Sequence, residues 1–166
     1  MSIARLLLKE LVAEGATTRK VLERMPEEKF EWTPHEKSMP LGKLASHVAH
    51  IPSWVAFTLE RDELVAGPDT PGPKPAKNAA ELVANFDQEM EAAKASLEIV
   101  EDATLKANWK MKMGDRVVID APRHEVLRRW VFNHMVHHRA QLGLYLRLND
   151  LPVPAIYGSS ADEQDW

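Results

Sequence analysis

The sequence predicts an all-α fold: a four-helix bundle with one long crossover connection and a small β-hairpin before the last helix. Three observations predict it. Four long segments repeat apolar residues at the spacing of an amphipathic helix, a run rich in proline and glycine separates the second segment from the third, and 166 residues can bury one core without disulfides. We therefore expect a single domain over residues 1–166.

The first predicted helix spans about residues 2–25. Its apolar residues recur from Ile3 through Leu7 and Leu11 to Met25, and Pro26 ends it. Residues 26–30 fit one short helical turn, and residues 32–38 read as a loop that holds Trp32 against the core.

The second predicted helix begins near Pro40, because proline is well placed in a first helical turn, where its missing N–H leaves nothing unpaired. Pro52 is a problem for the same helix, since an interior proline removes a hydrogen bond at a cost of about 3 kcal/mol. It either kinks the helix one turn beyond His47 or ends it early, and we expect the kink.

The crossover is predicted at residues 67–77, where four prolines and two glycines exclude a helix or a central strand. The third helix then runs from about Asn78 to Val100. Asn78 with Glu81 three residues on resembles a capping box, which is typical of a helix start.

The hairpin is predicted around Gly114-Asp115, between extended residues 105–113 and 116–120. Pro122 opens the fourth helix, which continues to about Asn149 before Pro152 and Pro154 prevent more. At 1.5 Å per residue this helix is roughly 40 Å long.

Two histidines of the fourth helix, His134 and His138, are four residues apart, so both imidazoles stand on one face and can reach one ion. Stepping about 100° per residue places both in the apolar stripe of this helix, and places His47 in the apolar stripe of the second helix. We therefore predict a site of three imidazoles, which requires the second and fourth helices to be neighbours.

The other reading of His134 and His138 is a pair of core histidines held by hydrogen bonds. Four further residues are candidates for supporting roles. His50 and His137 fall at the borders of the apolar stripes, Gln141 lies where it could orient a water or a ligand imidazole, and Tyr145 either supports the site or simply packs. No catalytic residue is assigned.

Three neutral imidazoles bind zinc, nickel, copper or iron, and the donor set alone does not choose among them. One to three coordination positions would remain for water or substrate. The chain contains no cysteine, so any thiol chemistry would use a thiol supplied by a cosubstrate.

Composition argues against several other functions. The 21 basic and 25 acidic side chains give a net charge of −4, with no basic face for nucleic acid. The amino terminus has only a three-leucine run, too short for a signal peptide or a membrane span, so we expect a cytoplasmic protein.

Several motifs in combination resemble the DinB-like family, which is named for DNA-damage-inducible genes and related to YfiT. They are His47 seven residues before Trp54, His134-x-x-x-His138, Arg139-Ala140-Gln141-Leu142 and Pro152-Val153-Pro154-x-x-Tyr157-Gly158. The resemblance extends from Trp32 to Glu163. It implies a four-helix bundle, a homodimer and a divalent metal held by His47, His134 and His138, and its name implies no DNA contact. Related folds include mycothiol- or bacillithiol-linked transferases and a maleylpyruvate isomerase, in which the metal activates a low-molecular-weight thiol.

Three functions are open at this stage. The first is a metal-dependent enzyme that activates water or a small thiol for hydrolysis or S-transfer on a small-molecule substrate. The second is a non-catalytic metal-binding stress-response protein. The third is a structural dimeric bundle whose histidines are incidental.

Overall fold

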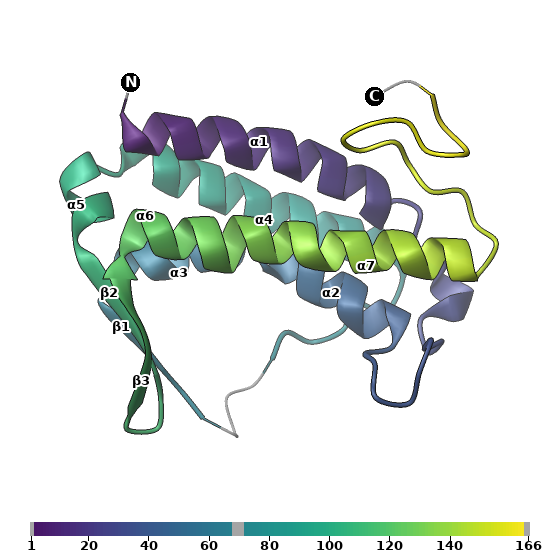
Figure 1. Ribbon diagram of the computed structural model, residues 1–166, viewed down its shortest axis with the longest axis horizontal. Coiled ribbons are helices and arrows are strands. Elements are labelled where there is room, and N and C mark those ends of the chain that lie inside the picture. The colour runs from purple at the N-terminus through teal and green to yellow at the C-terminus, as the bar shows by residue number, and fades with distance from the viewer. Residues whose placement is uncertain (1, 68–71, 165–166) are drawn as a thin grey trace.

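The structure is a computed structural model that describes residues 2–67 and 72–164. It is mostly helical, with a small three-stranded sheet at one end of the helices (Figure 1). The elements in chain order are α1 (Ile3–Leu22), η1 (Glu27–Lys29), α2 (Leu41–His50), α3 (Ser53–Glu60), β1 (Glu63–Ala66), α4 (Ala79–Ile99), α5 (Asp102–Lys106), β2 (Asn108–Met113), β3 (Arg116–Pro122), α6 (Arg123–Val126), η2 (Leu127–Asn133) and α7 (His134–Leu148).

Only two of the four predicted long helices, α1 and α4, are single uninterrupted α-helices. Both have side-chain caps at their first turn: Ser2 accepts a hydrogen bond from the backbone N–H of Arg5, and Asn78 accepts one from that of Glu81 at 2.8 Å. The Glu81 carboxylate in turn accepts from the backbone N–H of Lys77. The predicted helix start at Asn78 therefore has the polar contacts that its sequence indicated.

The predicted second helix is divided at Pro52 into α2 and α3. Ile51 and Pro52 keep right-handed helical dihedral angles, but the regular hydrogen bonding stops at His50 and resumes at Ser53. The expected kink in one helix is thus an interruption, because Pro52 has no N–H to continue the pattern. The break lies about one turn beyond His47.

The predicted all-α class is wrong in one respect, because the extended region is a three-stranded sheet and not a lone hairpin. β2 and β3 form the expected antiparallel pair around Gly114, whose φ of +58° favours glycine. β1 then pairs in parallel with β2, with Glu63 opposite Lys110. Residues 68–71 of the predicted crossover lie outside the described residues, and residues 72–77 have no regular secondary structure.

The last helical run, predicted as one α-helix over residues 122–149, comprises α6, η2 and α7. Its central segment, η2, has π-helical hydrogen bonds over Leu127–Asn133. Figure 1 shows the three parts as one continuous rod. Regular α-helical geometry resumes at His134, so the two predicted ligands of this rod stand on an ordinary α-helix.

The long helices pack around a shared apolar core. α1 contacts α4 and α7, while α2 contacts both α4 and α7. The predicted neighbourhood of the second and fourth helices is therefore present as the contact between α2 and α7. Among the fully buried core side chains are Leu11, Leu44, Phe86, Leu127 and Leu142.

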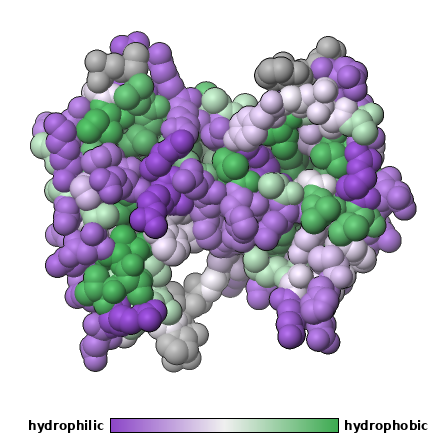
Figure 2. Space-filling view, viewed as in Figure 1, coloured by the Kyte–Doolittle hydropathy of each residue, from purple (hydrophilic) through white to green (hydrophobic). Residues whose placement is uncertain are grey.

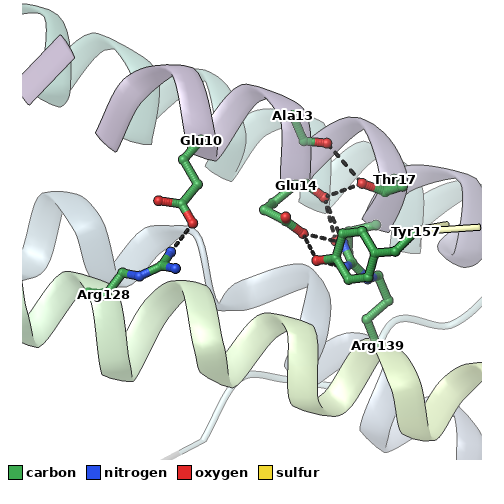
Figure 3. A network of polar contacts seen from close by, with 8 residues as sticks. Glu10, Ala13, Glu14, Thr17, Arg128, Arg139 and Tyr157 are labelled. Carbon is green, nitrogen blue, oxygen red and sulfur yellow. Dashed lines mark hydrogen bonds and ion pairs between the residues drawn. The ribbon is translucent and has the colours of Figure 1, made fainter. Parts of the chain in front are cut away.

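The carboxyl-terminal segment is tied to the helices by polar contacts (Figure 3). Arg139, only 1% exposed, forms an ion pair with Glu14 of α1 and donates to the hydroxyl of Tyr157. Tyr157 donates to the same Glu14 carboxylate at 2.6 Å. Arg139 and Tyr157 thus tie the carboxyl-terminal segment to α1.

The surface is of mixed character. On the face seen in Figure 2, apolar residues form separate patches among hydrophilic ones. None of the helices in the described part of the chain has the length and apolarity needed to cross a membrane.

Candidate metal centre

Two helices bring the three predicted histidines together. His47 comes from α2, three residues before that helix ends, and His134 and His138 come from the first two turns of α7. All three side chains are partly buried, so their rings face neighbouring helices yet remain reachable from solvent. The contact between α2 and α7 places His47 opposite the other two.

The imidazole nitrogens converge on one place. One nitrogen from each histidine can be chosen such that all three lie within 4.8 Å of one another. The Nε2 atoms of His47 and His134 are 2.9 Å apart, a hydrogen bond in which one ring donates and the other accepts. The ring centroids are separated by 4.5 to 5.2 Å.

The surroundings of the triad favour neutral rings. Burial, reinforced by the charge of His138, lowers the pKa of His47 to about 4, and the same causes lower the pKa of His134 to about 4. Burial also lowers the pKa of His138, and the hydrogen bond that this ring donates to Gln141 opposes the effect. Neutral imidazoles at neutral pH have the free lone pairs that a metal ion requires.

Gln141 fixes the orientation of His138. The Nδ1 atom of His138 lies 2.6 Å from Oε1 of Gln141, one helical turn further along α7. An amide oxygen only accepts, so Nδ1 carries the proton and Nε2 keeps its lone pair. Metal-binding histidines commonly hold their second nitrogen in this way.

The other three candidates occupy different positions. His137 is exposed, and its ring contacts that of His138 at 4.8 Å. His50 faces α4, where Nδ1 lies 3.4 Å from a carboxylate oxygen of Glu89. Tyr145 is buried, and its hydroxyl donates to the backbone carbonyl of Met39. The structure thus brings Gln141 and His137 to the triad, whereas His50 pairs with α4 and Tyr145 bonds to the backbone of Met39.

Two indole rings flank the triad. Trp54 of α3 lies 5.8 Å from His47 and 5.3 Å from His134, measured between ring centroids. Trp130 of η2 stacks on His134 at 6.2 Å with an interplanar angle of 22°. No sequence pattern indicated the π-helical segment that carries Trp130, since hydrogen-bond register leaves no composition signal.

The donor set fits a divalent metal ion. Two nitrogens on one tetrahedral ion with bonds of about 2.0–2.1 Å are roughly 3.3 Å apart, close to the 2.9 Å between the Nε2 atoms of His47 and His134. Rotation of imidazole rings about their side-chain bonds can adjust the wider separation. Three nitrogen ligands leave at least one position for water or substrate.

The structure also has two surface cavities away from the triad. One, of about 260 Å³, lies between α2 and α4 and is lined by residues that include His50 and Glu89. The second, of about 430 Å³, lies between α1 and the last helical rod and includes Leu6, Leu7 and Arg128. Neither cavity is lined by a histidine of the triad.

The fold and the sequence both relate the chain to known proteins. A structure of a DinB-like protein from Bacillus cereus ATCC 10987 superposes with a TM-score of 0.72 at 22% identity, covering 91% of this chain and 95% of that one. A DinB-like protein from Bacillus subtilis gives a TM-score of 0.67 at 14% identity, covering 96% and 99%. No curated protein matches the sequence. The sequence profile of the DinB family matches residues 1–165, and the chain therefore belongs to the DinB family.

Proposed function

We propose that the protein is a metal-dependent enzyme in which His47, His134 and His138 hold a divalent ion that activates water or a low-molecular-weight thiol. The observation that carries this proposal is the convergence of the three imidazole nitrogens within 4.8 Å of one another. The reaction would be a hydrolysis or an S-transfer on a small-molecule substrate.

The chemistry follows from the donor set. Because the three imidazoles are neutral, an ion held there would keep its full double charge and could lower the pKa of a water or thiol ligand towards neutrality. Gln141 holds the His138 ring at a fixed angle through Nδ1. The chain has no cysteine of its own, so a sulfur nucleophile would have to come from a cosubstrate.

The alternative is a non-catalytic metal-binding stress-response protein. It agrees with the lining of the two surface cavities described above, which consists of residues outside the triad. A binding protein needs the ion but no substrate-sized cavity beside it. Both proposals predict a bound metal ion, so metal content does not distinguish them. Only the enzyme should show turnover.

The remaining expectations accompany the proposal. The ion is zinc, nickel or iron, chosen in the cell by supply and affinity. The protein acts in the cytoplasm as a homodimer, without nucleic acid or membrane partners.

Elemental analysis of protein purified without a histidine tag is the first test, with about one ion per chain expected. Metal-loaded protein is then assayed with ester and amide panels, and with thiol cosubstrates and electrophiles. The variant His138→Ala should lose both the ion and turnover, whereas the matched variant His137→Ala should keep the ion. Stoichiometric metal without turnover on any panel would support the binding protein instead.

A further inference from the structure

Trp54 and Trp130 are both accessible beside the histidine triad. Trp130 is 37% exposed and Trp54 is partly buried, and both rings contact that of His134. We propose that these two indoles form the binding surface for a planar aromatic group of the substrate. This inference deepens the proposed function and rests on it.

The backbone that carries Trp130 is unusual. Residues 127–133 adopt π-helical hydrogen bonding, which is rare and frequent at functional sites. In an ordinary α-helix, Trp130 would be offset from His134 by about 40° around the axis, because they are four residues apart. A π-helix has more residues per turn, so the irregular segment changes this offset, and the two rings lie 6.2 Å apart at an interplanar angle of 22°. The irregular segment ends where the triad begins.

Trp130 stacks on a ring of the triad and yet remains exposed. Trp130 and His134 are close to parallel, at 22°, so one face of the indole is turned toward the imidazole. Trp130 is nevertheless 37% exposed, so part of the indole remains available to a ligand. An aromatic ring bound there gains offset stacking in addition to the burial of apolar area.

The charge of the site selects among possible flat ligands. Indole faces also attract cations, but a divalent ion on three neutral imidazoles would repel a cation held a few ångströms away. A neutral ring avoids this repulsion. The inferred substrate therefore carries a planar aromatic group without positive charge, and its reacting atom faces the triad.

A single exposed apolar side chain is ordinary on protein surfaces, and Trp130 alone would carry no inference. Three independent features meet here: a second indole on another helix, stacking on a ring of the triad, and the π-helical segment beneath. Trp54 and Trp130 lie on helices that are far apart in the sequence. Only the tertiary fold brings both indoles to His134.

The test is a titration of metal-free protein with 2-naphthol, a neutral planar probe at neutral pH, followed through the indole N–H signals in a proton–nitrogen NMR spectrum. The signals of Trp54 and Trp130, assigned from Trp→Phe variants, should shift. Those of Trp32, which packs on Tyr145, and of the buried Trp109 should stay in place. The saturated analogue decahydro-2-naphthol should bind roughly three- to tenfold more weakly, because it cannot stack.

Variants give a second measure. Trp130→Ala should weaken 2-naphthol binding roughly three- to tenfold, whereas Leu144→Ala, which removes a more exposed apolar side chain from α7, should leave it unchanged. Three outcomes would each overturn the inference. They are equal affinity for the saturated analogue, shifts shared by all indole signals, and a Trp130 signal that moves when the protein is diluted, as it would if Trp130 lay in a contact between two chains. Because the protein is metal-free throughout, a failure of metal binding is detected separately, by elemental analysis.

Discussion

Replacing Arg139 with methionine should destabilise the protein by about 3 kcal/mol, at the lower end of the 3–5 kcal/mol expected for breaking a buried ion pair. The guanidinium is 1% exposed, and the Glu14 side chain opposite it is 15% exposed at an N–O distance of 2.7 Å. Arg139 also donates to the backbone carbonyl of Glu14 and to the hydroxyl of Thr18, both at 3.2 Å. The variant removes these contacts. Glu14 keeps the hydrogen bonds that Tyr157 and Thr18 donate to it, and these bonds together with its partial solvent access set the lower value.

Urea unfolding followed by circular dichroism measures this loss, and a thermal scan should show a fall in Tm of roughly 6–12 °C for a chain of this size. The matched control is Arg147→Met, on the same helix, whose ion pair with Asp162 is exposed. It should cost about 1 kcal/mol or less. Equal losses in the two variants would refute the reasoning from burial.

A double-mutant cycle isolates the pair. Glu14→Leu alone leaves Arg139 as an uncompensated buried charge and should also be strongly destabilising. The double variant Glu14→Leu with Arg139→Met carries no unpaired charge and should lose less than the sum of the single losses, by at least about 2 kcal/mol. Additive losses would mean that the two side chains act independently.

Three further predictions concern the site and the sheet end of the fold. Zinc or nickel at about 100 times its Kd should stabilise the protein by about 2.7 kcal/mol, which a rise in Tm would show. The rise should be lost in His138→Ala and kept in His137→Ala. Arg123→Met should lower the free energy of unfolding by about 2–4 kcal/mol, measured by urea unfolding. The reason is that this buried guanidinium donates to four backbone carbonyls and one carboxylate. A loss below about 1 kcal/mol would contradict the inference that these contacts hold the sheet end of the fold together. Folding lowers the pKa of His47 and His134 from 6.5 to about 4, so the unfolded chain binds more protons between these values. Stability of the metal-free protein should therefore be complete above pH 6.5 and fall as the pH is lowered towards 4, and the urea midpoint of a His134→Asn variant should fall less.

The sequence was most informative where local chemistry decides local structure. Proline, the capping residue Asn78 and apolar periodicity predicted the starts of the long helices closely. The face angles of His47, His134 and His138 predicted that their rings would lie on inward stripes, and the contact between α2 and α7 brings them together. Both predictions rest on the regular geometry of an α-helix.

The sequence was least informative where distant contacts decide. β1 has four residues, and it is a strand because β2 offers it a parallel partner more than 40 residues later. The short helix α5 is likewise set by its neighbours, since Asp102 accepts hydrogen bonds from the first backbone N–H groups of α1. No local sequence pattern predicts either element.

The buried ion pair of Arg139 and Glu14 also helps to orient the imidazoles of the triad. On a regular helix Arg139 is about 100° around the axis from His138, so α7 is held from two directions: Arg139 bonds to α1 on one side, and the imidazoles face α2 on the other. Rotation of α7 about its axis would break the Arg139 contacts before it moved the imidazoles far. Arg139→Met should therefore widen the spread of ring orientations as well as lower stability, and weaker metal binding in a variant that is still folded would be its signature. Unchanged metal affinity in that variant would show that contacts of α7 with α2 alone orient the rings.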